Sequence, residues 1–161
     1  MRRRRNARRV APAMTLLGAL LVAGGVARGV AGGDWPAWRG PGASGSSTET
    51  DLPTKWDVVW SAPHGGRSTP VVHRGRVFVL NRAGSGVDEQ ERVQCFDAAS
   101  GDALWEHRFS VYLTDIPSTR IGWASPAVDP ETGYVYAQGV QNTFVCLDRD
   151  GRQVWGRQLH E

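Results

Sequence analysis

The stretch that decides the fold of this 161-residue chain is Val93-Gln-Cys-Phe-Asp-Ala-Ala-Ser-Gly-Asp-Ala-Leu-Trp105. The same pattern returns as Phe144-Val-Cys-Leu-Asp-Arg-Asp-Gly-Arg-Gln-Val-Trp155, with one residue deleted in the turn. The alignment pairs Cys95 with Cys146, Asp97 with Asp148, Gly101 with Gly151, and Trp105 with Trp155. Because four identities align in order, the chain is predicted to contain an internal repeat.

The match extends upstream of this stretch. Ser68–Val72 and Ala124–Val128 share a Pro followed by apolar residues, and each precedes a short run of aromatic and β-branched residues. The two units are offset by 56 residues at the prolines and by 50 residues at the tryptophans. A period near 50 residues that is built from short strands is typical of β-propeller blades.

Each unit is predicted to form four short strands, because Val, Phe, Tyr and Trp dominate runs that turn residues separate. The runs are 69–73, 76–80, 92–97 and 103–109 in the first unit, and 125–129, 134–138, 143–148 and 153–159 in the second. A long polar loop is expected at 83–91. The expected fold is all-β, with two antiparallel blades at 68–109 and 124–159. The ring would be incomplete, since propellers close with about four to eight blades.

The Asp, Gly and Trp of the repeat have a mechanical interpretation. The aspartate carboxylate caps the last hairpin turn, and the glycine takes the positive φ that ends it. The tryptophan then projects from the outer strand at a fixed height and can pack against the neighbouring blade. We therefore assign docking and turn roles, and no catalytic role, to six residues: Asp97, Gly101, Trp105, Asp148, Gly151 and Trp155.

Residues 1–31 have the layout of an export signal. Arg2–Arg9 is basic, Val10–Ala27 carries no charge, and Gly29-Val30-Ala31 offers the small residues for cleavage after Ala31. A retained membrane anchor is the alternative, and the modest apolarity of the uncharged run favours cleavage. We expect export to the periplasm or the extracellular space, with membrane contact only through this segment.

The formal net charge of +3 arises in the same N-terminal segment. Seven of the 19 basic residues lie in 1–31, which leaves 12 basic against 16 acidic side chains in 32–161. An acidic body does not attract a polyanion, so we expect no nucleic-acid partner.

Three segments resemble a known group of proteins. Asp97–Trp105, an Asp-x-x-Ser-Gly-x-x-x-Trp pattern, resembles the tryptophan-docking motif of PQQ-type β-propeller repeats. These repeats are named for quinoproteins that bind pyrroloquinoline quinone. Asp34–Pro41 and Thr114–Pro126 resemble segments of exported bacterial PQQ-binding-like propeller proteins. The resemblance implies a propeller fold and leaves the activity open, and it alone implies the quinone as a cofactor.

The resemblance also divides the chain. Residues 32–55 are expected to form an extended N-terminal linker, and 56–161 a partial PQQ-like propeller. Trp56–Ala62 resembles the strand that completes the last blade and closes the ring. Its partner strands would come from a downstream sequence or from further copies of the chain.

Few residues indicate chemistry. Cys95 and Cys146 occupy equivalent strand positions, which lie too far apart for a disulfide, and are expected to pack in the interior. The four histidines show no metal-ligand spacing. The candidate binding loop lies between the two units, where Asp115, Arg120 and Trp123 combine two charges with an aromatic ring.

The favoured function is therefore that of an exported, non-catalytic propeller segment, part of a longer propeller, which acts as a scaffold or binds a protein or polymer. One alternative is the N-terminal part of a quinone-dependent dehydrogenase that oxidises alcohols or sugars. The other is a short structural unit that assembles a ring from its own copies.

Overall fold

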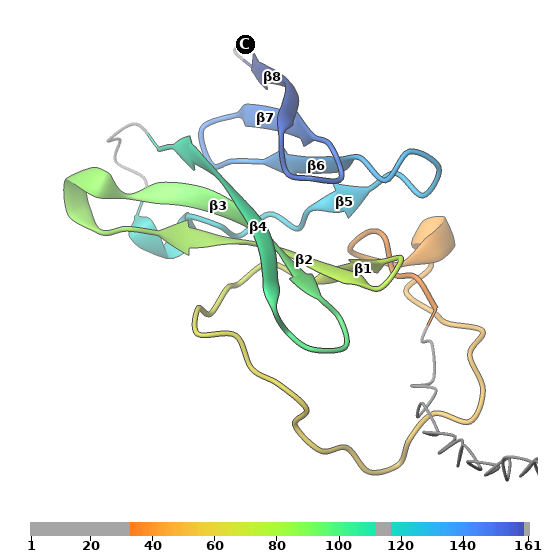
Figure 1. Cartoon of the computed structure of the whole chain (residues 1–161). Helices are drawn as coiled ribbons and strands as arrows, with labels where there is room; N and C mark the ends of the chain where they lie inside the picture. Colours follow the sequence, from red (N-terminus) through yellow and green to blue (C-terminus); the bar gives the residue numbers. More distant parts are fainter. Residues whose placement is uncertain (1–32, 112–116, 160–161) are drawn as a thin grey trace, which may run out of the picture.

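The computed structural model describes residues 33–111 and 117–159, and its strands form two four-stranded antiparallel sheets (Figure 1). The first sheet contains β1 (Val71–His73), β2 (Arg76–Ala83), β3 (Gln90–Asp97) and β4 (Ala103–Ser110). The second contains β5 (Ala127–Val128), β6 (Val135–Gln138), β7 (Thr143–Leu147) and β8 (Gln153–Gln158). In each sheet the spatial order follows the chain order. The all-β fold of two propeller blades is thus confirmed.

The described residues also contain three short 3-10 turns: η1 (Pro41–Ala43) precedes β1, η2 (Gly86–Asp88) lies between β2 and β3, and η3 (Ser118–Arg120) lies between β4 and β5. Within the described residues, no helix has the length and apolarity that a membrane span requires. The predicted export signal and Asp115 lie outside the described residues.

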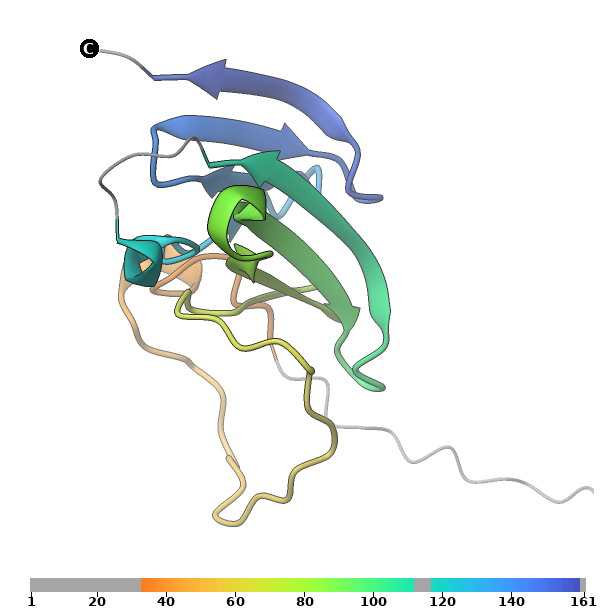
Figure 2. The same ribbon diagram turned by 90° about the vertical axis from the view of Figure 1, so that its left-hand side faces the viewer.

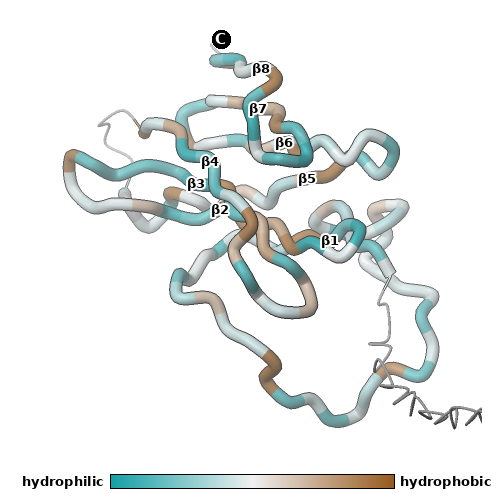
Figure 3. Tube along the Cα trace, viewed as in Figure 1, coloured by the Kyte–Doolittle hydropathy of each residue, from teal (hydrophilic) through white to brown (hydrophobic). Residues whose placement is uncertain are grey.

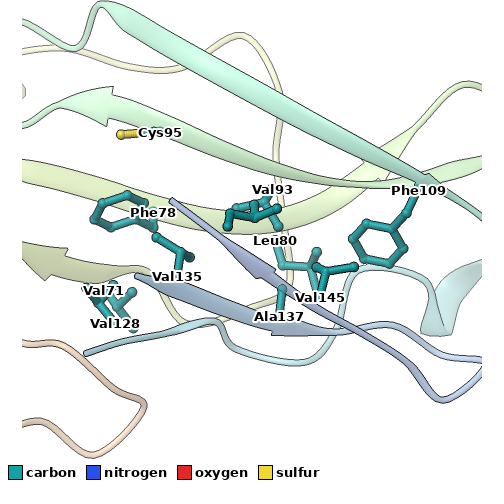
Figure 4. Close-up of a cluster of buried hydrophobic side chains, with 11 residues drawn as sticks. Val71, Phe78, Leu80, Val93, Cys95, Phe109, Val128, Val135, Ala137 and Val145 are labelled. Atoms are coloured by element: carbon teal, nitrogen blue, oxygen red, sulfur yellow. The ribbon is translucent and has the colours of Figure 1, made fainter. Parts of the chain in front are cut away.

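The two sheets stack face to face, with the inner strands β1 and β5 in contact (Figure 2). Alternate residues of each strand point into the space between the sheets, as the two-residue period of a strand dictates. Figure 4 shows how the apolar side chains of both sheets meet there. Their burial contributes roughly 1.5–3 kcal/mol for each large side chain. The first sheet supplies Val71, Phe78, Leu80, Val93, Cys95 and Phe109, and the second supplies Val128, Val135, Ala137, Val145 and Leu147.

The long polar loop expected at 83–91 is shorter in the structure, because β2 and β3 stay paired as far as Ala83 and Gln90. Polar side chains on the outer face of this sheet bond to one another across the strands. The Asn81 amide donates to Gln94 (2.8 Å), and Arg92 Nε donates to Asn81 Oδ1 (3.0 Å). The predicted loop is nevertheless present at 84–89, and only its ends differ from the prediction.

The start of the expected N-terminal linker is tied to both sheets. Trp35 forms an antiparallel bridge with Val72 of β1, with N···O distances of 2.8 and 2.9 Å. The N–H of Val128 in β5 donates to the carbonyl of Pro36 (2.7 Å). Asp34 accepts a hydrogen bond from the Arg74 N–H (2.8 Å). These bonds hold residues 34–36 across the inner edges of both blades.

The expected closing strand at 56–62 forms no strand in this structure. Trp56, Val58 and Val59 are 82%, 86% and 82% exposed, and Figure 3 shows an apolar stretch within the long excursion that precedes β1. A strand needs neighbouring strands for its backbone hydrogen bonds, and the described residues provide none beside this segment.

Candidate functional site

The repeated aspartates each organise their own hairpin turn. Asp97 Oδ1 accepts hydrogen bonds from the backbone N–H groups two and three residues further on (3.0 and 2.9 Å). Asp148 Oδ1 accepts from those two and four residues further on (2.8 and 2.9 Å). These bonds, chiefly from Ser100 and from Arg152, lower the pKa of the two carboxyl groups. Each carboxylate is therefore engaged within its own turn.

Trp105 links the first blade to the turn of the second. Its Nε1–H donates to the Arg149 carbonyl (2.9 Å), and its ring lies against Gly151. Gly151 has a φ of +79°, and a Cβ at this position would lie 2.6 Å from the indole. The glycine thus provides both the turn conformation and the surface on which the indole packs.

Trp60 makes the same contact with the first blade. Its Nε1–H donates to the Ala98 carbonyl (3.0 Å), and a Cβ on Gly101 would lie 2.5 Å from its ring. The ring also stacks on Phe96, with centroids 6.1 Å apart. This role of Trp60 was not predicted from the sequence. The available signal was the Val-Trp pair that recurs at Val59-Trp60 and Val154-Trp155.

Trp155 occupies the equivalent position on the far side of the second blade. It clusters with Tyr136 and Phe144, and ring centroids in this cluster lie 5.5 to 6.3 Å apart. Among the described residues, its indole N–H has no hydrogen-bond acceptor. We call Tyr136, Phe144, Cys146 and Trp155 the Trp155 face, and the strand register makes it equivalent to the inward face of the first sheet that carries Phe78, Cys95 and Trp105.

Of the predicted binding residues Arg120 and Trp123, only Trp123 lines a cleft. Trp123 is 57% exposed and lines a cleft of about 450 Å³ together with Trp38, Arg67, Thr69 and Ser125. Arg120 is not among the residues that line the cleft. Trp38 and Arg67 were not predicted from the sequence as binding residues. Arg67 precedes Thr69 as Trp123 precedes Ser125, so the repeat alignment held the signal for this pair.

A family profile described as the outer membrane protein assembly factor BamB matches residues 53–161. The match includes all three tryptophans of the docking pattern, Trp60, Trp105 and Trp155, and both blades. The chain belongs to this family. A search of curated proteins found no match. The BamB family is built on PQQ-like propeller repeats, in agreement with the resemblance of Asp97–Trp105.

One buried carboxylate joins the two blades of this BamB-family chain. Glu91 on β3 is 2% exposed and accepts hydrogen bonds from the N–H of Gly122 (2.9 Å) and of Val140 (3.0 Å). Burial raises the pKa of this carboxyl, against the opposing effect of the two N–H donors. Glu91 was not predicted from the sequence, and it has no acidic counterpart in the second unit.

The thiols are buried and unpaired with each other. Burial raises the pKa of Cys95 to about 12 and also raises the pKa of Cys146. Both are therefore neutral thiols near pH 7, whereas a nucleophilic cysteine needs a lowered pKa. Burial lowers the pKa of His107, against an opposing contribution from Gln153 of β8.

Pyrroloquinoline quinone works with a calcium-type ion held by oxygen ligands. In the part of this BamB-family chain that the structure describes, no group of three or more His, Cys, Asp or Glu side chains is placed to hold a metal ion. The described residues do not fit that requirement, and we derive no step through the quinone.

We predict that Gly151→Ala destabilises the chain more than Gly75→Ala. Both glycines have positive φ, +79° and +73°, but a Cβ at Gly75 would meet no atom within 4 Å. Gly75→Ala should therefore cost about 1 kcal/mol from backbone strain alone. Gly151→Ala should cost about 2 kcal/mol, because the Trp105 ring must also move. Urea unfolding of the two variants measures the difference, and equal losses would argue against indole packing on this turn.

Proposed function

We propose that the chain is an exported, non-catalytic propeller segment that serves as a scaffold and joins a further blade through the Trp155 face. One observation carries this proposal. The Trp105 contact is completed inside the chain, whereas the equivalent Trp155 face has no facing sheet among the described residues. A large apolar sheet face with this geometry is suited to receive another blade.

The chemistry of the faces indicates which occupant fits. The face of the second sheet that receives Trp105 is apolar, with Val135, Ala137, Val145 and Leu147. A further blade that repeats this apolar face and a glycine-containing turn would match the Trp155 face.

A second copy of the chain fits less well. On the outer face of its first sheet, Asn81, Arg92 and Gln94 are already buried in a hydrogen-bonded network. The turn that Trp155 would need, next to Gly101, already holds Trp60. A further blade is therefore favoured over a second copy.

The non-catalytic part of the proposal has its own support. Glu91 and Asp97 accept backbone hydrogen bonds, and the Cys95 thiol is buried in the core. Each of these groups is engaged in holding the fold. Export is supported by the basic, uncharged and small-residue pattern of 1–31.

The proposal is tested by adding a blade. A second copy of residues 111–159, fused after residue 159, places another apolar face and turn downstream of the Trp155 face. The fusion should unfold at a higher temperature than the single chain. It should not bind more of the apolar dye anilinonaphthalene sulfonate, because the added blade covers one Trp155 face and exposes one equivalent face.

The rise in unfolding temperature should disappear, and dye binding should increase, when Trp155→Ala is introduced into the first copy. Val154→Ala on the same strand is the matched control, because Val154 is exposed and lies at the irregularity of the β7–β8 pairing, outside the Trp155 face. It should change neither the unfolding temperature nor the dye binding of the fusion. A fusion with a folded added blade and an unchanged midpoint would rule out docking at the Trp155 face.

A further inference from the structure

The cleft lined by Trp38, Arg67, Thr69, Trp123 and Ser125 lies where the two blades begin. Arg67 and Trp123 occupy equivalent positions, each two residues ahead of the repeated Thr/Ser-Pro that leads into the inner strand. The Thr69 N–H donates to Ser125 Oγ (3.0 Å), which binds the two leading segments together. The repeat therefore brings a guanidinium and an indole to one place.

Trp38 enters the cleft from a third, fixed segment. The bonds of Trp35 to Val72 and of Pro36 to Val128 anchor the chain just before it. The Gly40 N–H donates to the Ala37 carbonyl (2.8 Å) and closes a turn around Trp38. Trp38 is nevertheless 65% exposed, so its indole offers a large apolar surface in a defined position.

Arg67 gives the cleft its charge. It is the one ionisable side chain among the five lining residues. One of its Nη atoms donates to the Thr119 carbonyl, which orients the guanidinium. A guanidinium retains further N–H donors, and a carboxylate can accept two of them side by side. A second cavity of about 310 Å³ shares Arg67 and is also lined by Arg82, Gly66 and Gly122.

We propose that this cleft binds an acidic saccharide, with the carboxylate of a uronic acid at Arg67 and pyranose rings against Trp38 and Trp123. The ring carbons of a pyranose present C–H groups that pack on an indole face, while its hydroxyls bond to side chains such as Ser125. The second cavity leaves room for a neighbouring sugar. The site shares no residue with the Trp155 face, so the two proposals stand or fall separately.

The charge distribution of the chain favours an acidic saccharide over single-stranded nucleic acid, which is also an anionic polymer. Single-stranded nucleic acid also stacks on aromatic rings, but it needs a positively charged groove along its backbone. Residues 32–161 carry more acidic than basic side chains, and the cleft has a single arginine. One carboxylate beside sugar rings matches this arrangement better than a continuous phosphate backbone.

The test is calorimetric titration of the full chain with tri-galacturonate, with maltotriose as the neutral probe. Tri-galacturonate should bind, and Arg67→Gln and Trp123→Ala should each weaken its binding by about tenfold or more. Maltotriose should bind more weakly, and Arg67→Gln should not change its affinity. Trp123→Phe should retain most of the affinity of the wild-type chain.

Two matched controls lie outside the cleft. Trp56→Ala removes another exposed indole, and Arg120→Gln removes another exposed arginine from the same inter-blade region. Both should change the affinity by less than about twofold. The proposal is overturned by absent tri-galacturonate binding, by equal losses in the controls, or by tighter binding of tri-glutamate or oligothymidylate. Thermal midpoints establish that each variant is folded.

Discussion

Replacing Trp105 with alanine is expected to lower the free energy of unfolding by about 3 kcal/mol. The indole packs against the core with Phe78, at a centroid distance of 5.9 Å, and covers Gly151. Its N–H also donates to the Arg149 carbonyl of the second blade. Removing it opens a cavity between the blades and leaves that carbonyl without this donor. Trp105 is half-buried, which places the loss at the lower end of the range for large aromatic truncations.

Trp155→Ala is the matched control for this result. It removes the same side chain from the same position of the repeat, where no turn of a following blade receives it among the described residues. We expect it to cost about 1 kcal/mol, from its contacts with Tyr136 and Phe144. Equilibrium urea unfolding of both variants measures the contrast. A loss below about 1 kcal/mol for Trp105→Ala would refute the docking role.

The features predicted correctly from the sequence are those that depend on neighbouring residues. Each strand predicted within the two repeat units overlaps a strand of the structure, because β-branched and aromatic runs between turn residues carry a local signal. The repeat added long-range information that a single strand lacks. It identified the two blades because the same local pattern occurred twice in the same order.

The features that were missed depend on contacts between distant segments. Glu91 acts through Gly122 and Val140, which lie in two other loops. Trp38 reaches the cleft because residues 34–36 pair with both inner strands. Neither contact leaves a pattern in the nearby sequence. Trp60 and Arg67 were missed for another reason, since each follows from extending the repeat alignment upstream.

The segment 56–62 shows the opposite case, in which a local pattern predicted a strand that does not form. Its Trp and Val residues have the composition of a strand, yet a strand forms only where another backbone is available for pairing. Only its end is fixed, through the Trp60 contact with the first blade. The same residues would be expected to pair if the proposed further blades supply a neighbouring strand.

Glu91 is expected to be as important for stability as Trp105, because its carboxylate accepts two backbone hydrogen bonds between distant segments. Glu91→Ala leaves the buried N–H of Gly122 and the half-buried N–H of Val140 without their acceptor, and a buried loss of this kind costs about 1–3 kcal/mol. We predict a total loss of about 3 kcal/mol or more at pH 7. Glu89→Ala is the control two residues away, where the carboxylate pairs with the exposed Arg82 (3.1 Å). It should cost less than about 1 kcal/mol.

The pH dependence of stability isolates the charge of Glu91. Its pKa in the folded chain is raised above the ordinary value of 4.5, chiefly by burial, so the folded state holds the proton more tightly than the unfolded state. The resulting stabilisation is complete below pH 4.5 and is lost as the pH rises through the raised pKa. Glu91→Gln cannot ionise, so the stability of the wild-type chain relative to this variant should fall over that interval. The lowered pKa values of Asp97 and Asp148 act in both proteins and cancel in the difference. Urea unfolding from pH 4 to 8 measures the free energy of unfolding of the wild-type chain relative to Glu91→Gln. If this relative stability rises with pH, the two N–H donors have a larger effect on the pKa of Glu91 than burial has.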